Sequence, residues 1–217
     1  MMKTWTKELQ ATITPAMALT LLKEGNNRFV NNLKLHRNLL QQVNETSDGQ
    51  HPFAVILSCI DSRTSAELIF DQGLGDIFSI RIAGNIINDD ILGCMEYGCK
   101  VAGSKIIVVL GHTKCGAIKG ACDNMEIGNL TTLLNKIQPA IHDERSETEN
   151  RTSSNPEFVE KVTAINVRKT LIAILKRSPI LKEMIDTGAI GIIGGKHDIT
   201  TGVVDFYDDT LILNNPK

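Results

Sequence analysis

The sequence lacks the features that mark several large classes of protein. No stretch is long and apolar enough to span a bilayer, and the opening residues MMKTWTKELQATITP contain no continuous apolar run of the kind found in signal peptides. A formal net charge of -2 gives no reason to expect binding to nucleic acid or to an anionic membrane surface. We therefore expect a cytoplasmic protein with neither a membrane nor a nucleic-acid partner.

The cysteines do not suggest a disulfide framework. There are five, an odd number, in a chain of 217 residues that is large enough to fold without cross-links. In a reducing compartment this usage favours free thiols or metal ligands. We expect Cys94, Cys99 and Cys122 to be small buried hydrophobic residues. Cys59 and Cys115 lie in motifs and require a different interpretation.

No internal repeat and no linker divides the chain, so we expect one domain over residues 1–217. Short apolar runs alternate with amphipathic segments, which is typical of an α/β fold with a mainly parallel central sheet flanked by helices. Thr14 followed by Pro15 predicts the start of an N-terminal helical arm over about residues 14–35. We expect helices also over 65–70 and 89–101, and strands over 53–58, 77–80, 105–110, 190–193 and 203–207.

Chemically active side chains follow two of the expected strands. Cys59 comes directly after the first strand, and His112 comes shortly after the third. Working residues collect at the carboxyl edge of a parallel sheet, so the two should meet there. Cys115 is three residues beyond His112, and we expect one helical turn to place both on the same face. Two thiolates and an imidazole form a ligand set known from catalytic zinc sites, and Asp61 is the candidate to approach the fourth position.

The segments CIDSR and GHTKCGA resemble the paired Cys-x-Asp-x-Arg and His-x-x-Cys motifs of the β-class carbonic anhydrases. The resemblance extends through ELIFDQGLGDIFSIRIAGN, EYGCKVAG and DITTGVVDF, and so covers roughly residues 14 to 207. It implies one zinc ion per subunit, bound by Cys59, His112 and Cys115, and a catalytic dyad of Asp61 and Arg63. Ile60 and Ile82 depart from the family pattern without removing a reactive group.

The implied reaction is the reversible hydration of carbon dioxide to bicarbonate and a proton. Zinc lowers the pKa of a bound water from ~15.7 to near ~7 in the best cases, which yields a zinc-bound hydroxide. Two thiolates cancel most of the charge of the metal, so we expect activity to rise on the alkaline side of neutrality. Asp61 can accept a hydrogen bond from the nucleophile, and Arg63 can hold that carboxylate bidentately. If Arg63 released it, Asp61 could ligate the metal and close the site.

The resemblance also implies a substrate pocket and an oligomer. Several pocket positions come from the neighbouring subunit of a dimer in this family, whose members are dimers or larger assemblies such as tetramers. The apolar stripe of the helical arm would pack on that partner. The positions that match the family pocket are Gln50, Phe78, Ala83, Tyr97 and Gly116.

Two alternatives remain open at this point. The same zinc site could hydrolyse carbonyl sulfide or carbon disulfide. Alternatively, the protein could be a zinc-containing scaffold or regulator, whose metal would have four protein ligands and no exchangeable water.

Regulation by bicarbonate is a further property of some members of the family. It uses a pocket made by a tryptophan, an arginine and a tyrosine. Arg81 matches the arginine here, but Ile56 and His197 stand where the other two would be. Because an anion beside Arg81 would lose two hydrogen bonds, we expect a simple, noncooperative pH profile, unless a protonated His197 can replace one donor.

Overall fold

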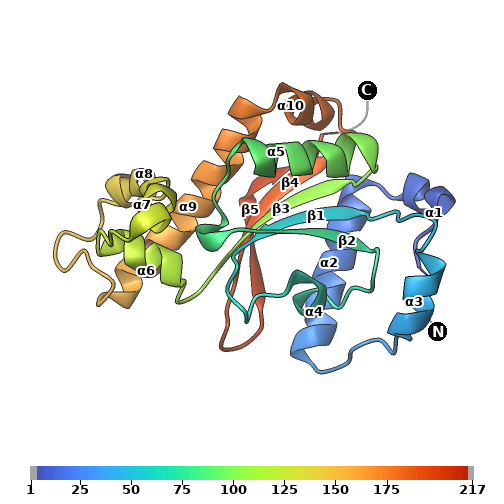
Figure 1. The fold of residues 1–217 in the computed structure, drawn as a ribbon, viewed down its shortest axis with the longest axis horizontal. Coiled ribbons are helices and arrows are strands. Elements are labelled where there is room, and N and C mark those ends of the chain that lie inside the picture. The colour runs from blue at the N-terminus through green and yellow to red at the C-terminus, as the bar shows by residue number, and fades with distance from the viewer. Residues whose placement is uncertain (1–3, 215–217) are drawn as a thin grey trace.

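Five strands form one sheet in the computed structural model, which describes residues 4–214. They are β1 (Ala54–Ser58), β2 (Ile77–Arg81), β3 (Ile106–His112), β4 (Gly191–His197) and β5 (Val204–Ile212). The strand order is β2-β1-β3-β4-β5; the first four strands are mutually parallel, and β5 pairs antiparallel with β4. The expected α/β class with a mainly parallel sheet is therefore confirmed (Figure 1).

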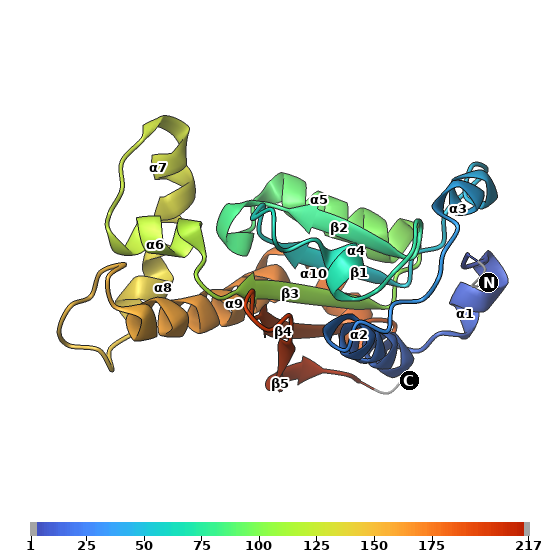
Figure 2. The same cartoon turned by 90° about the horizontal axis from the view of Figure 1, so that it is seen from below.

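Helices cover both faces of this sheet, and three more lie beyond its carboxyl edge (Figures 1 and 2). In chain order, the helices and helical turns are α1 (Lys7–Thr12), α2 (Pro15–Val30), α3 (Leu39–Glu45), α4 (Ala66–Ile69), the 3₁₀ turn η1 (Ala83–Asn85), α5 (Asp89–Glu96), the π-helical turn η2 (Tyr97–Val101), α6 (Gly116–Cys122), α7 (Gly128–Asn135), α8 (Gln138–Asp143), α9 (Pro156–Arg177) and α10 (Pro179–Asp186). Helices α6 to α8 form the group beyond the sheet.

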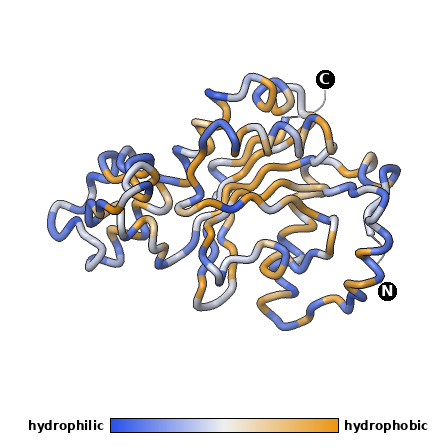
Figure 3. The backbone as a smooth tube through the Cα atoms, viewed as in Figure 1, coloured by the Kyte–Doolittle hydropathy of each residue, from blue (hydrophilic) through white to orange (hydrophobic). Residues whose placement is uncertain are grey.

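The sheet is buried because its two faces meet different helices. Every residue of β1 and β3 is buried, as expected for parallel strands covered on both sides. One face packs on α2 and α4 through residues such as Leu22 and Phe70. The other packs on α5, α9 and α10 through residues such as Met95 and Leu181. The strands accordingly form the continuous hydrophobic centre of the molecule (Figure 3).

The N-terminal segment agrees with the expected arm at its start. The Thr14 side chain accepts a hydrogen bond from the Met17 backbone N–H, and Pro15 is the first residue of α2. The polar stretch after residue 38 contains one element that we did not expect, the helix α3, which leaves Leu39 and Leu40 exposed. Within residues 4–214, no helix is long and apolar enough to cross a membrane.

Candidate metal centre and active site

The turn that follows β1 forms the first half of the site. Cys59 is buried directly after the strand. Thr64 closes the turn, since its backbone N–H donates to the Asp61 carbonyl (2.9 Å) and its hydroxyl donates to the Cys59 carbonyl (3.2 Å). Arg81, at the end of the neighbouring β2, donates to the same two carbonyls over 3.1 Å to Cys59 and 2.7 Å to Asp61. Two segments of the chain therefore fix this turn.

The second half of the site lies where β3 leads into α6. His112 is the last residue of β3, and Cys115 is the N-cap residue of α6, with extended backbone angles. The expectation that one helical turn aligns these two residues is wrong. A tight turn joins them instead, and Lys114 within it has a φ of 58°. This turn leads the chain from β3 out to α6 and leaves Cys115 beside Cys59 at the sheet edge.

Three donor groups converge at this edge of the sheet. One ligand atom from each of Cys59, His112 and Cys115 lies within 4.8 Å of the other two, and all three residues are buried. The two sulfur atoms are 3.9 Å apart. The separation suits two thiolates on one tetrahedral ion, whose Zn–S bonds are about 2.3 Å long.

His112 can donate a lone pair to a metal ion from its Nε2 atom. His112 Nδ1 lies 3.0 Å from the Thr113 carbonyl, which can only accept, so Nδ1 carries the proton. Nε2 is then a bare acceptor, and it is buried with no hydrogen-bond partner in residues 4–214. A carbonyl that orients a histidine in this way is the usual arrangement around metal-binding imidazoles. The donor set therefore fits zinc.

The environment of Cys59 favours a thiolate. The Cys115 thiol donates to the Cys59 sulfur and lowers the pKa of Cys59, although burial opposes this; the backbone N–H groups of Gly84 and Asp61 lower it further. The same contact and burial raise the pKa of Cys115. One thiol thus ionises readily, and a bound cation would be needed to hold both as thiolates.

Arg63 holds the Asp61 carboxylate in a bidentate ion pair. Its Nε donates to Oδ1 (2.9 Å), one terminal nitrogen donates to Oδ2 (2.7 Å), and its backbone N–H donates to Oδ1 (3.0 Å). These bonds, the side-chain ones above all, hold the pKa of Asp61 well below its usual range. The carboxylate is thereby kept ionised and pointed in one direction. It is not one of the three converging donors.

Two of the five expected pocket residues lie at the same edge of the sheet. Ala83 begins η1, directly after the segment that follows β2, and Gly116 is the first residue of α6 beside Cys115. A Cβ atom built on Gly116 would meet nothing within 4 Å, so the space in front of this residue is open.

The other three pocket residues lie elsewhere in the chain. Gln50 lines a polar depression with Thr46 and Gly75, at the amino edge of the sheet. Phe78 pairs with Val55 in the first half of β1 and β2, and its ring stacks edge-on against Tyr97 at 6.1 Å. From Ala54 to Cys59 the chain covers about 17 Å at ~3.3 Å per residue. Gln50 therefore cannot reach the sulfur of Cys59 in its own chain.

The residues that replace the family's bicarbonate pocket offer little to an anion. Ile56 is fully buried, and neither ring nitrogen of His197 has a hydrogen-bond partner within residues 4–214. Burial, with a smaller contribution from His112, lowers the pKa of His197 to about 4. Arg81 already donates to two carbonyls. His197 is therefore neutral near pH 7, and a simple pH profile stays our prediction.

Some contributors to the site were missed by sequence reasoning. Gly84 has a φ of 68°, and a Cβ on it would come within 2.8 Å of the Ile137 side chain, so a larger residue would be strained here. Its carbonyl accepts a hydrogen bond from the buried Asn166 (2.8 Å). The sequence Ala83-Gly84-Asn85 was the signal that could have indicated a tight turn at this place.

Of the remaining cysteines, Cys99 and Cys122 are buried as expected. Cys94 is exposed, so the expectation that it would be buried was wrong.

A parallel sheet that collects two cysteines, a histidine and an Asp–Arg pair at its carboxyl edge defines a class of zinc enzyme. Residues 54–204 match the family model described as carbonic anhydrase. The chain belongs to the β-carbonic anhydrase family.

Two mycobacterial relatives illustrate this membership. Carbonic anhydrase 2 of Mycobacterium tuberculosis is 36% identical over 196 residues, which cover 87% of this chain and 90% of the relative. A carbonic anhydrase of Mycolicibacterium smegmatis is 32% identical over 197 residues, covering 88% and 92%.

Solved structures of the same family share the fold. The β-carbonic anhydrase CcaA is 27% identical, with a TM-score of 0.69 and coverage of 92% of this chain and 93% of the other. CafA of Aspergillus fumigatus is 26% identical, again with a TM-score of 0.69, and coverage is 89% and 90%. A tetrameric enzyme of Sordaria macrospora, at 24% identity, supports the fold alone.

Proposed function

We propose that this protein is a zinc-dependent carbonic anhydrase that interconverts carbon dioxide and bicarbonate, with the Cys59, His112 and Cys115 cluster as its metal site. The observation that carries this proposal is the convergence of three donor atoms within 4.8 Å, with a buried His112 Nε2 that lacks any other partner in residues 4–214. When bound, zinc acidifies water and so supplies the nucleophile near neutral pH.

Asp61 acts as the acceptor that orients this nucleophile. A carboxylate offers about four lone pairs, two on each oxygen. Oδ1 accepts two hydrogen bonds from Arg63 and Oδ2 accepts one. One lone pair of Oδ2 is thus left for a further hydrogen bond. Because Arg63 holds the pKa of Asp61 well below its usual range, Asp61 accepts this hydrogen bond without taking the proton.

The substrate pocket is shared between two subunits of a homodimer, which larger assemblies such as tetramers can contain. Ala83 and Gly116 contribute in the chain that supplies the metal ligands, and Gln50, Phe78 and Tyr97 contribute to the site of the neighbouring subunit. The exposure of Tyr97 (55%) and Val101 (71%) supports this arrangement, because a free surface seldom gathers such side chains without a partner. The exposed Leu39 and Leu40 of α3 supply more apolar surface for the same contact.

The scaffold alternative is weakened by the state of Asp61. A closed shell would need a fourth protein ligand, and Asp61, the nearest candidate by sequence, is held by Arg63 and is not among the converging donors. We also propose that residues 1–217 form one domain and that the protein works in the cytoplasm. The free state of all five cysteines supports a reducing compartment.

Stopped-flow hydration of carbon dioxide, on protein whose zinc content has been measured, tests this function. We expect the rate to scale with zinc occupancy and to rise above neutral pH. Parallel assays with carbonyl sulfide and carbon disulfide decide between the related activities. A fully zinc-loaded protein that does not accelerate carbon dioxide hydration would refute the proposal.

A further inference from the structure

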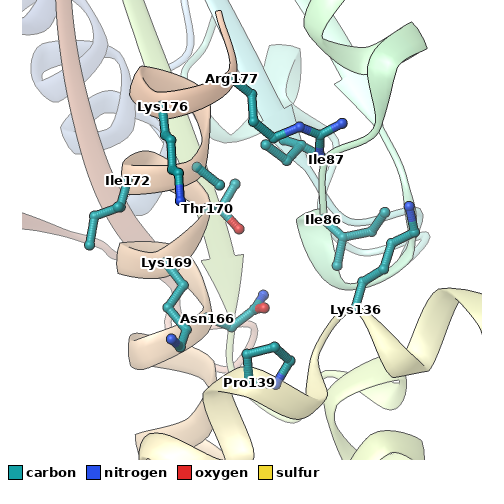
Figure 4. A pocket seen from close by; sticks show the side chains of 11 residues that line it. Ile86, Ile87, Lys136, Pro139, Asn166, Lys169, Thr170, Ile172, Lys176 and Arg177 are labelled. Carbon is teal, nitrogen blue, oxygen red and sulfur yellow. The ribbon is translucent and has the colours of Figure 1, made fainter.

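A basic pocket lies outside the candidate active site, between α9 and the corner where α7 leads into α8. Its volume is about 410 Å³, which is within the size range of small-molecule sites. Figure 4 shows α9 along one side, and Ile86 and Ile87 with Lys136 and Pro139 on the other. We propose that this pocket binds a small organic anion that carries two or more negative charges.

The charge of the lining is the first argument. Lys136, Lys169, Lys176 and Arg177 line the pocket, and none of the described residues that line it is acidic. Lys169 and Lys176 lie two turns apart on α9, whereas Lys136 stands across from them beside Ile86 (Figure 4). Four like charges around one hollow repel one another, and a bound anion would relieve this repulsion.

The existing ion pairs leave this positive charge largely uncompensated. Lys169 pairs with Asp143 (2.5 Å) and Arg177 pairs with Asp89 (2.7 Å), but both acids lie outside the lining and are well exposed. Exposed pairs of this kind contribute little and exchange readily. Within residues 4–214, neither Lys136 nor Lys176 has an ion pair within 4 Å. The pocket therefore carries a net positive charge that is available to a ligand.

The interior of the pocket indicates what else the ligand must contain. Ile86, Ile87 and Ala173 provide apolar walls, so a compact carbon body can be buried there. Asn166 and Thr170 lie deep in the lining and are 4% and 5% exposed. Asn166 donates to the Gly84 carbonyl (2.8 Å), which fixes this part of the pocket before any ligand arrives.

The substrate of the proposed reaction is a poor match for this pocket. Bicarbonate has four heavy atoms and one charge, so it would leave most of the volume and most of the cations without contact. The occupant is therefore a larger molecule, with a phosphate group or paired carboxylates on an apolar body. Phosphate and carboxylate share the required charge and acceptor geometry.

Isothermal titration calorimetry with phenyl phosphate and phthalate tests the proposal, with benzoate as the singly charged comparison. The pocket variant is Lys136→Ala/Lys176→Ala. The matched control is Lys23→Ala/Lys182→Ala, which removes the same charge from α2 and α10, outside the pocket. Zinc content is measured before and after titration, and thermal unfolding verifies that each variant folds.

We expect at least one doubly charged probe to bind the wild-type protein and the control more tightly than benzoate does. The pocket variant should bind it about tenfold more weakly or worse, because two charge-assisted contacts are lost. Lys136→Arg/Lys176→Arg should restore binding. The tighter of the two probes identifies phosphate or carboxylate as the preferred group. Absence of binding by both probes, or equal affinity in the pocket and control variants, would overturn the proposal.

Discussion

Two groups of expected site residues differ in how completely one chain assembles them. At the carboxyl edge of the sheet, Cys59, His112 and Cys115 converge within 4.8 Å and Asp61 is already oriented. Gln50, Phe78 and Tyr97 lie toward the amino edge, where Gln50 lines a polar depression and Tyr97 is exposed. The first group needs only a metal ion, whereas the second group contributes to a site only if another subunit approaches it.

The difference follows from how a parallel sheet positions its residues. Strand ends bring turns from distant parts of the chain to one edge, so the residues that complete the metal site are fixed by folding alone. A side chain at the amino edge of the sheet cannot reach the metal site in its own chain, because the length of a strand separates the two edges. The convergence of Cys59, His112 and Cys115 therefore depends on the fold of one chain. Any contribution of Gln50, Phe78 and Tyr97 to a site depends on the association of two chains.

Removal of a metal ligand should have the largest effect on the first group. In Cys59→Ala, one of three donors is missing, so bound zinc should be lost and carbon dioxide hydration should fall to background. Metal binding and folding are linked, so the midpoint of thermal unfolding should also fall. Elemental analysis and differential scanning calorimetry measure both. A variant that retains one zinc per chain would remove Cys59 from the ligand set.

Disruption of the dyad should affect catalysis but not metal binding. Asp61→Asn removes the charged acceptor, and Arg63→Ala removes the group that orients this acceptor. We expect roughly a hundredfold lower turnover in each variant. Zinc occupancy should stay near one per chain, because Asp61 is not among the converging donors. Near-normal turnover in both variants would mean that the nucleophile needs no orientation.

A mixing experiment tests whether the second group acts across subunits. Gln50→Ala/Tyr97→Ala should lower turnover about tenfold through lost substrate contacts. This variant is then co-expressed with Asp61→Asn. In a mixed dimer with shared pockets, one of the two sites combines Asp61 of the double variant with Gln50 and Tyr97 of the Asp61→Asn chain, so all three residues of that site are native. Activity above that of either variant alone supports the shared pocket. If every site is built within one chain, the mixture cannot exceed the average of the two.

Loosening of the N-terminal arm should produce the smallest effect on chemistry. Arg28 and Arg37 both contact Asp71 at 2.5 Å, and this cluster ties the segment that leads to Gln50 onto the body of the protein. Asp71 has a φ of 46°, which asparagine also tolerates, so Asp71→Asn removes charge without new backbone strain. We expect a loss of about 3 kcal/mol in unfolding free energy, with zinc retained.

The pH dependence of stability provides the control for this variant. Burial raises the pKa of Asp71, but hydrogen bonds from Arg28 and Arg37 outweigh it, so the pKa is lowered in the folded state. A lowered pKa means that the stabilisation is present above the unfolded value near ~4 and is lost as the pH falls. Denaturant titrations should therefore show the two proteins converging in strongly acidic buffer. A difference that persists there would assign the effect to packing.

Much of the fold could be predicted because the local signals were strong. The apolar runs preceding Cys59 and His112 specified buried parallel strands, and Thr14-Pro15 marked the start of α2. The failures have physical causes. Spacing alone suggested a helical turn between His112 and Cys115, but the left-handed conformation of Lys114 depends on the surrounding edge of the sheet. Cys94 is exposed because Asp89–Glu96 packs through Leu92 and Met95.

Gly84 links the metal centre to the opposite side of η1. The backbone of Gly84 contributes to the lowered pKa of Cys59, and its carbonyl accepts from Asn166, whose side chain lines the basic pocket. The N–H and the carbonyl of one residue belong to two different amides, so Asn166 acts on Gly84 by holding its backbone in place. An asparagine that lines the basic pocket therefore helps to hold in place the backbone that favours the Cys59 thiolate.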